Sequence, residues 1–545
     1  MSLLIDLFGY LSVVIHGLTI VAQSMALGGV LFAAILARPL APTLGASGAA
    51  IRERTERLAR LSALALVACE AATIALQGAV LVGTVDLSWS SVLGAEFALA
   101  GLIKITGALV IALTVGRLKA LPLAAAAVVL AAATFTTHAN ARLDDRLPLL
   151  AVEALHQLGA AIWIGGIPSF LIALDQCRDG LQWRRVGRRF SQMSMAGVAC
   201  IIVSGAVMFW FYVGGLAGFY GTAYGVMVGA KIAMFLCLLG LGAGNYFLVE
   251  RLRRDPSTPI TRLKRFAEVE IGVGFALFFA AASLTSSPPA VDLTTDRVSM
   301  AEIVERDTPQ WPRMSSPSHA DLALPALQSK LDAEAAAAAA KPAPAFVPGS
   351  GDLPPRNAED IAWSEYNHHW AGVFVVAIGL AALANQAGVG WARHWPLLFL
   401  GLAVFLFLRS DPEVWPLGEE GFFDSLRDVE VAQHRIFVLL TVAFGLFEWR
   451  VRAGGLQGTK AALVFPLVCA VGSALLLTHQ HAIANVKEQL LIELTHTPLA
   501  LAGTAAGWAR WLELRLDPPA STRAGWVWPI CLVLVGVILL LYREA

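Results

Sequence analysis

The chain begins with an apolar run at residues 8–36, FGYLSVVIHGLTIVAQSMALGGVLFAAIL, in which His16 is the only acidic or basic side chain. A helix needs roughly 20 apolar residues to cross the hydrocarbon of a bilayer, because each residue adds only about 1.5 Å of length. The run is longer than the core of a secretion signal, and it lacks a basic leader and a clear cleavage site. We therefore predict a retained first transmembrane helix.

Composition extends this prediction to the whole chain. Of its 545 residues, 57% are hydrophobic and 15% are charged, and a water-soluble core could not bury so much apolar surface. The formal net charge is +0, so nothing indicates a nucleic-acid partner. We predict an all-α polytopic bundle of about fourteen transmembrane helices in a lipid bilayer. The predicted spans are 8–36, 61–85, 95–116, 121–138, 148–173, 191–214, 222–249, 267–286, 368–387, 395–409, 432–449, 461–480, 490–509 and 525–542.

Basic residues indicate the orientation of these helices. Arginine and lysine in short loops mark the cytoplasmic side, and here they follow every second predicted span. Arg52 and Arg60 belong to the first such loop, and Arg184 and Arg189 to the third. The intervening loops are acidic or mixed, as at 411–430. The alternation predicts a multi-pass protein with both termini outside the cytoplasm.

A stretch of different composition separates the predicted spans into about eight before it and about six after it. Residues 288–364 contain an alanine tract at 335–340 and many prolines, which is typical of a largely irregular linker with no packed core of its own. We therefore predict an eight-helix membrane domain at 1–287, an extracytoplasmic linker at 288–364 and a six-helix, histidine-rich membrane domain at 365–545.

The predicted topology places most of the eleven histidines at or near the extracytoplasmic ends of their helices. Ionisable groups within a bilayer are costly and usually face a cavity or a partner, so this layer is a candidate site. His394 falls on the cytoplasmic side and His319 in the linker. The candidate metal ligands are His16, His138, His156, His368, His369, His434, His479, His481 and His496.

Carboxylates precede several of these histidines by one helical turn, which places both side chains on one helical face. Such a carboxylate could orient an imidazole, bind a metal directly or accept a proton. A simpler interpretation is also open, because acidic residues favour the first turn of any helix and interfacial histidines are often only hydrated. The pairs are Glu153 with His156, Glu365 with His368, Glu493 with His496, and Glu430 with His434; Glu153 and Glu493 join the candidate ligands.

Residue chemistry alone leaves the bound group open between a transition metal and haem, since imidazole and carboxylate suit several metals and facing histidines can hold a haem. The six cysteines are scattered singly, which gives no hint of a thiolate site. No nucleophile triad, phosphate loop or redox dithiol is apparent, so we do not expect a conventional enzyme.

A set of short motifs in the first half has a distinctive order and spacing. These are His156 to Gly166, Arg189-Phe190-Ser191 leading to Ser204-Gly205, Tyr224-Gly225 with Lys231 and Asn245, Glu268 and Glu270, and Pro288-Pro289. In these motifs the chain resembles the copper-resistance D (CopD) family of bacterial inner-membrane proteins, best over about 148–290. The resemblance implies copper as the metal, His156 as part of a copper path, and a small periplasmic copper-binding protein as a partner. It also implies a bacterial inner membrane, with both termini then periplasmic. The second block remains unassigned.

Together these features predict copper import, homeostasis or tolerance through a His/Glu site near the periplasmic face, with the oxidation state of the copper open. Two alternatives remain. One is a membrane protein that binds haem b for electron transfer, although histidines near only one face favour metal uptake over an electron path across the bilayer. The other is a non-transporting factor that delivers or senses copper.

Overall fold

The computed structural model describes residues 2–294, 297–317, 324–339, 357–456, 458–478 and 486–544. Within these ranges the regular elements are helices and none is a β-strand, which confirms the all-α class. Eleven of the described helices are long and apolar enough to cross a membrane, and Leu121–Thr134 and Lys460–Leu476 are shorter apolar helices. With α21 (Val486–Arg515), these helices coincide with all of the predicted spans. The protein is therefore a multi-pass membrane helix bundle.

The chain divides into two compact units. One consists of Met1–Tyr220, Met227–Thr295 and Leu477–Gln480, and the other of Gly221–Val226, Asp296–Leu476 and His481–Ala545. The domain limits predicted from the sequence stay a prediction. The helices up to Asp292 are α1 (Ser2–Phe32), the π-helix η1 (Ala33–Ala37), α2 (Arg38–Val85), α3 (Trp89–Leu93), α4 (Glu96–Thr114), α5 (Leu121–Thr134), α6 (His138–Ala141), α7 (Arg146–Trp163), α8 (Ile167–Gln176), α9 (Gly180–Tyr212), α10 (Leu216–Tyr220), α11 (Ala223–Arg254), α12 (Thr261–Thr285) and the short 3-10 helix η2 (Ala290–Asp292).

Small residues set the close approach of α1 and α7 in the first unit. A Cβ added to Gly28 would lie 2.3 Å from the carbonyl oxygen of Ala161, and one added to Gly165 would lie 2.0 Å from the carbonyl oxygen of Ser24. Backbones this close exclude any larger residue, as is common where transmembrane helices cross. The contact fixes α7, and with it the candidate residues Glu153 and His156, against α1.

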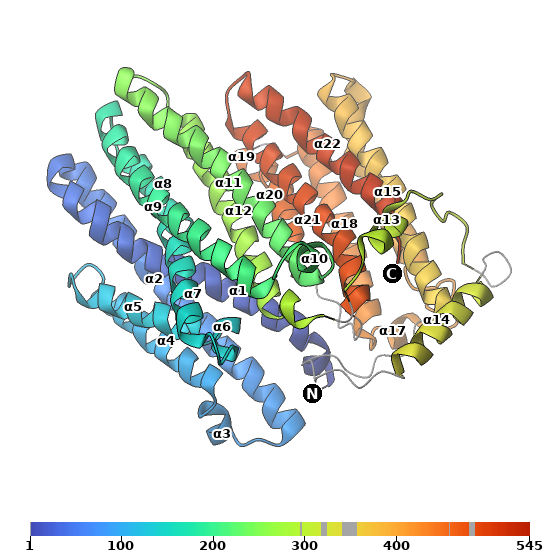
Figure 1. Ribbon diagram of the computed structural model, residues 1–545. Helices are drawn as coiled ribbons and strands as arrows, with labels where there is room; N and C mark the ends of the chain where they lie inside the picture. The colour runs from blue at the N-terminus through green and yellow to red at the C-terminus, as the bar shows by residue number, and fades with distance from the viewer. Residues whose placement is uncertain are drawn as a thin grey trace. The chain divides into compact units, whose positions relative to one another are not determined.

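The first two helices continue well beyond the length of a membrane span. The helix Leu7–Leu44 has 38 residues and Ala46–Val85 has 40, so each is close to 60 Å long at about 1.5 Å per residue. Gly45, at φ 56°, makes the reversal between them, and a Cβ there would meet nothing within 4 Å. Figure 1 shows the resulting hairpin of α1 and α2 in blue. The segment 37–60, which lies between two predicted spans, is thus a helical extension of both.

The predicted span 148–173 contains a break. It separates α7 from α8 after Trp163, where the N–H of Gly165 donates to Ala160 O, five residues back, and the N–H of Gly166 donates to Trp163 O, three residues back. Two adjacent glycines and Pro168 in the first turn of α8 explain the interruption, because neither residue type favours a helix interior.

The linker contains more helix than its composition suggests. Helix α13 (Met300–Asp307) begins with a capping box between Ser299 and Glu302, and α14 (Leu324–Ala339) packs against α15 (Ala358–Gln386). The alanine tract favours helix strongly, which accounts for α14.

The second unit is built around the pairing of α15 with α22 (Ala520–Leu540), which lie side by side in Figure 1. A Cβ at Gly536 would lie 2.5 Å from Val376 N, so small residues again set the separation. The aromatic side chains of Trp395, Phe465 and Trp528 lie in its buried core. The remaining helices are the 3-10 helix η3 (Gly390–Leu397), α16 (Leu398–Arg409), α17 (Phe422–Ser425), α18 (Val429–Arg452), α19 (Thr459–Ala462), α20 (Val464–Leu476) and α21.

Candidate functional site

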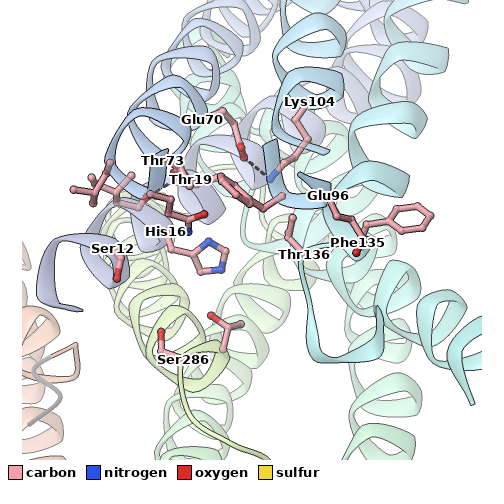
Figure 2. Close-up of a pocket in the computed structure, with 15 residues that line it drawn as sticks. Ser12, His16, Thr19, Glu70, Thr73, Glu96, Lys104, Phe135, Thr136 and Ser286 are labelled. Carbon is pink, nitrogen blue, oxygen red and sulfur yellow. Dashed lines mark hydrogen bonds and ion pairs between the residues drawn. The ribbon is translucent and has the colours of Figure 1, made fainter. Parts of the chain in front are cut away.

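A cavity of about 390 Å³ lies between α1, α2 and α4 of the first unit. Figure 2 shows the imidazole of His16 and the side chains of Glu70 and Lys104 pointing into the same space. Lys104 Nζ lies 2.5 Å from Glu70 Oε1, and both side chains are buried. Because the two charges compensate each other, the cavity is polar without a net charge from this pair.

His16 was predicted from the sequence, but its two charged neighbours were not. Glu70 and Lys104 lie inside the predicted spans 61–85 and 95–116, and an ionisable residue within a span is itself a signal of function. Hydroxyl groups complete much of the remaining wall, including those of Thr19, Thr73 and Thr136. This lining could accept a hydrated ion.

His156 has a defined tautomer in the interior of the first unit. Its Nδ1 lies 3.0 Å from Ser204 Oγ, and the Ser204 hydroxyl donates its hydrogen to Cys200 O at 2.6 Å. Ser204 must then accept from Nδ1–H, which leaves the lone pair on Nε2. A metal could therefore bind His156 only through Nε2, with Ser204 orienting the ring.

Glu153 belongs to a buried chain of polar side chains one turn away from His156. Gln157 Nε2 donates to Glu153 Oε1 at 3.1 Å, and Gln23 Nε2 of α1 donates to Gln157 Oε1 at 3.0 Å. Lys231 of α11 is close enough to interact electrostatically with both Glu153 and His156. The predicted pair thus lies in one polar region formed by α1, α7, α9 and α11.

His138 ends the predicted span 121–138, but in the structure that apolar helix ends at Thr134 and His138 begins the separate short helix α6. Its Nε2 lies 3.3 Å from Leu284 O, and its ring is tilted against Tyr212 with 6.1 Å between the centroids. Burial lowers the pKa of His138, which favours the neutral imidazole. Its position links α6 to the end of α12.

The second unit brings His368 of α15 and His496 of α21 together, with a ring-centroid distance of 6.2 Å and an interplanar angle of 85°. In each residue Nδ1 donates to the carbonyl one turn earlier, Ser364 O at 2.8 Å and Ile492 O at 3.0 Å. These bonds place the lone pair of both neutral rings on Nε2. Two imidazoles from different helices are therefore presented in the same tautomer.

Tyr542, just after α22, completes this cluster. Its ring stacks on His368 at 3.9 Å and meets the His496 ring edge-on at 5.9 Å. Its hydroxyl donates to Glu544 Oε2 at 2.7 Å. Burial and then the charge of Glu544 raise the pKa of Tyr542, so the phenol is neutral. Tyr542 and Glu544 were not predicted from the sequence: Tyr542 is the last residue of the predicted span 525–542, Glu544 follows that span, and neither matches a motif.

His369 has backbone partners at both ring nitrogens. The N–H of Arg313 donates to Nδ1 at 2.7 Å, and Nε2 donates to Tyr542 O at 2.7 Å. The Arg313 side chain pairs with Glu365 at 2.9 Å, so Glu365 is held by the linker segment. The geometry points to a structural role for His369, which ties the linker and the C-terminal residues to α15.

The remaining candidates have separate partners. His434 Nδ1 lies 2.6 Å from Asp411 Oδ1. Burial alone would raise the pKa of Asp411, but the hydrogen bond and charge of His434, with Ser410 and Arg435, hold that pKa below its usual value. Glu493 Oε2 accepts from the Thr497 hydroxyl at 2.8 Å.

Two candidate ligands, His479 and His481, lie outside the described residues. Among the residues that the structure does describe, no group of three or more His, Cys, Asp or Glu side chains is arranged to hold a metal ion. The described candidates therefore offer imidazoles singly or, at His368 and His496, as a pair.

Comparisons with known proteins point to copper. The family model CopD, copper resistance protein D, matches residues 184–284, a segment that contains Ser204, Lys231, Asn245 and Glu270. Copper transport protein CutJ of Bacillus subtilis (strain 168) is 32% identical over 163 residues, which cover 29% of this chain and 29% of that protein. No solved structure matches the chain. The predicted resemblance to the CopD family is confirmed, and the family model places it at residues 184–284.

Proposed function

Since residues 184–284 carry the CopD family likeness, we propose that this protein binds copper at the periplasmic side of a bacterial inner membrane and imports it. The CopD match is the observation that carries the proposal, because it includes Ser204, the residue that sets the tautomer of His156. The relative CutJ bears the name of a copper transport protein, which supports transport over storage. The basic loops support an orientation with both termini in the periplasm.

Within the first unit, we assign copper binding to His156 through Nε2. Glu153 supplies a carboxylate one turn from His156 on the same helix. A positively charged Lys231 nearby opposes a second positive charge, so copper binding is favoured when Glu153 is ionised and compensates it.

Within the second unit, we assign a further copper position between His368 and His496. If two imidazoles bind a metal in line through Nε2 at bond lengths of about 2 Å, each ring centroid lies about 3 Å from the metal, so the centroids are about 6 Å apart. The observed 6.2 Å matches this spacing. The Tyr542 ring stacked on His368 fixes one of the two ligands in place. A small periplasmic copper-binding protein is the partner that we expect to supply the ion.

The test is metal analysis of the purified, copper-loaded protein together with its visible absorption spectrum. We expect bound copper without the intense Soret band of haem, and less copper per chain in His156→Ala. His394→Ala is the matched control, because His394 is held by Trp449 and Arg393 near the predicted cytoplasmic side and should leave the copper content unchanged. Unchanged copper in His156→Ala would remove His156 from the site, and a Soret band would put haem b in place of copper.

Import itself requires a second measurement, copper uptake into proteoliposomes that contain the folded protein. We expect uptake to exceed that of protein-free vesicles and to fall in His156→Ala. Copper-loaded protein that catalyses no uptake would overturn import and leave delivery or sensing of copper as the function.

A further inference from the structure

A second cavity, of about 330 Å³, lies within the first unit next to the break between α7 and α8. Trp163 borders it at the end of α7, Ser194 from α9, Asn245 from α11 and Glu270 from α12. Discontinuous membrane helices often border ion sites in transporters, because the break leaves room and exposes polar groups. Copper binding as proposed above uses none of these residues.

Glu270 is the ionisable group deepest in this cavity wall. It is 4% exposed, Asn245 Nδ2 donates to its Oε1 at 2.6 Å, and the Trp163 side chain also hydrogen-bonds to the carboxyl group. The other carboxyl oxygen, Oε2, is near Gly242 of α11. A Cβ added to Gly242 would lie 4.0 Å from Oε2 and 3.8 Å from the Trp163 ring. Small residues on α11 thus leave space beside this carboxyl oxygen.

The charged groups around Glu270 are paired with one another. On its own helix, α12, Arg265 pairs with Glu268. Lys264, also on α12, pairs with Asp175 of α8 at 2.6 Å. From α11, the phenol of Tyr246 lines the cavity and the thiol of Cys237 is within electrostatic range. Among the described residues, none of the ion pairs includes Glu270.

Two further polar atoms of the cavity wall lack partners. Within the described part of the chain, Asn245 Oδ1 and Ser194 Oγ are buried and have no hydrogen-bond partner. A polar space of this size can hold water that satisfies such groups. A bare carboxylate in the same place would be costly, because burial of an uncompensated charge is unfavourable, whereas a protonated carboxyl is neutral and can donate to such a water.

We propose that Glu270, with Asn245 and Ser194, forms a proton-binding site on the inner side of the first unit, meaning its predicted cytoplasmic side. The basic residues at 251–265 follow the predicted span 222–249 and so predict a cytoplasmic loop there. Glu270 lies nine residues, or roughly 14 Å, along α12 from Thr261 in that loop. The oxygen atoms of Glu270, Asn245 and Ser194 suit a proton or a hard cation better than copper. Glu270 takes a proton from cytoplasmic water at Oε2 and returns it there.

The coupling of this proton to copper movement rests on the proposed transport function. A proton bound at Glu270 neutralises its carboxylate in the second cavity. Release of that proton restores a negative charge on the route by which a cation would leave the first unit. Copper uptake should therefore depend on the pH of the inner compartment through Glu270.

The proton site is tested directly by infrared difference spectroscopy of the purified full chain at two pH values. We expect a carbonyl band of a protonated carboxyl group that disappears in Glu270→Gln. In Asn245→Leu the band should shift to higher frequency, because the hydrogen bond to Oε1 is lost, and a merely structural carboxyl that carries no proton would show no such shift. Glu268→Gln, whose carboxylate is paired with Arg265, is the matched control and should keep the band. A spectrum of Glu270→Gln identical to that of the unsubstituted protein would overturn the proposal.

Copper uptake into proteoliposomes at several internal pH values tests the coupling. We expect the uptake rate of Glu270→Gln to lose the pH dependence of the unsubstituted protein; an unchanged pH profile would overturn the coupling. If the unsubstituted protein takes up no copper, the transport function fails by itself, and the infrared band still decides whether Glu270 holds a proton.

Discussion

Replacement of Ser204 by alanine tests how the first unit prepares its candidate copper ligand. Ser204 Oγ accepts from His156 Nδ1 at 3.0 Å and donates to Cys200 O at 2.6 Å, so it holds both the tautomer and the ring orientation. In Ser204→Ala, Nδ1–H loses this partner; the ring keeps its hydrogen bond with the Ile201 backbone and is held less firmly. His156 itself remains, so copper should still bind, but more weakly.

The size of the effect follows from these contacts. Removal of an outer partner of a metal-binding histidine typically costs about 10-fold to 100-fold in metal affinity. Only one hydrogen bond to His156 is lost here, and alanine fills nearly the same volume as serine, so we expect the lower end. A 10-fold weaker affinity corresponds to about 1.4 kcal/mol, close to the value of one hydrogen bond.

Copper affinity should be measured by competition with a chelator of known affinity. Thr114→Ala is the matched control, because the Thr114 hydroxyl donates to the Val110 carbonyl in its own helix as Ser204 donates to Cys200. An affinity of Ser204→Ala within twofold of the unsubstituted protein, with His156→Ala impaired, would refute the positioning role. Loss of copper stoichiometry in Ser204→Ala would instead indicate that Ser204 does more than orient the ring.

Three further outcomes are expected from thermal unfolding in detergent. Gly165→Ala should lower the free energy of unfolding by about 1–3 kcal/mol, because its Cβ would lie 2.0 Å from Ser24 O; an unchanged melting temperature would contradict this. His369→Ala should cost about 2 kcal/mol through its two lost backbone hydrogen bonds, without changing the copper content. The lowered pKa of Asp411 means that the folded protein binds fewer protons there than the unfolded chain. Its stabilising pairing with His434 should be complete above the ordinary value of 3.8 and be lost as the pH falls through the lowered pKa, and Asp411→Asn should remove this part of the acid destabilisation.

Much of the fold was predictable because hydropathy and helix length depend on local sequence. The break in the span 148–173 was not predicted, since its residues are apolar on both sides and only Gly165, Gly166 and Pro168 interrupt them. The helical extension over 37–60 was missed for the opposite reason. A charged helix beyond the bilayer has no hydropathy signal, although alanine, arginine and glutamate favour helix there.

The candidate site was predictable only where its residues share one helix or lie within a span. The Glu153 and His156 pair follows from helical spacing, and the membrane environment marks His368 and His496. The contact between these two histidines depends on how α15 and α21 pack, which no spacing reveals. The orienting bonds at Nδ1 arise from the same packing and could not be anticipated.

The long hairpin of α1 and α2 also has a practical consequence for imaging. Its two helices run continuously from the bundle to a single reversing residue, Gly45, so an added helical protein spliced at that tip would be joined without a flexible connector. Such a fusion would turn with the first unit as one body. It would give a small membrane protein the extra mass and the recognisable outline that particle alignment in electron cryomicroscopy requires.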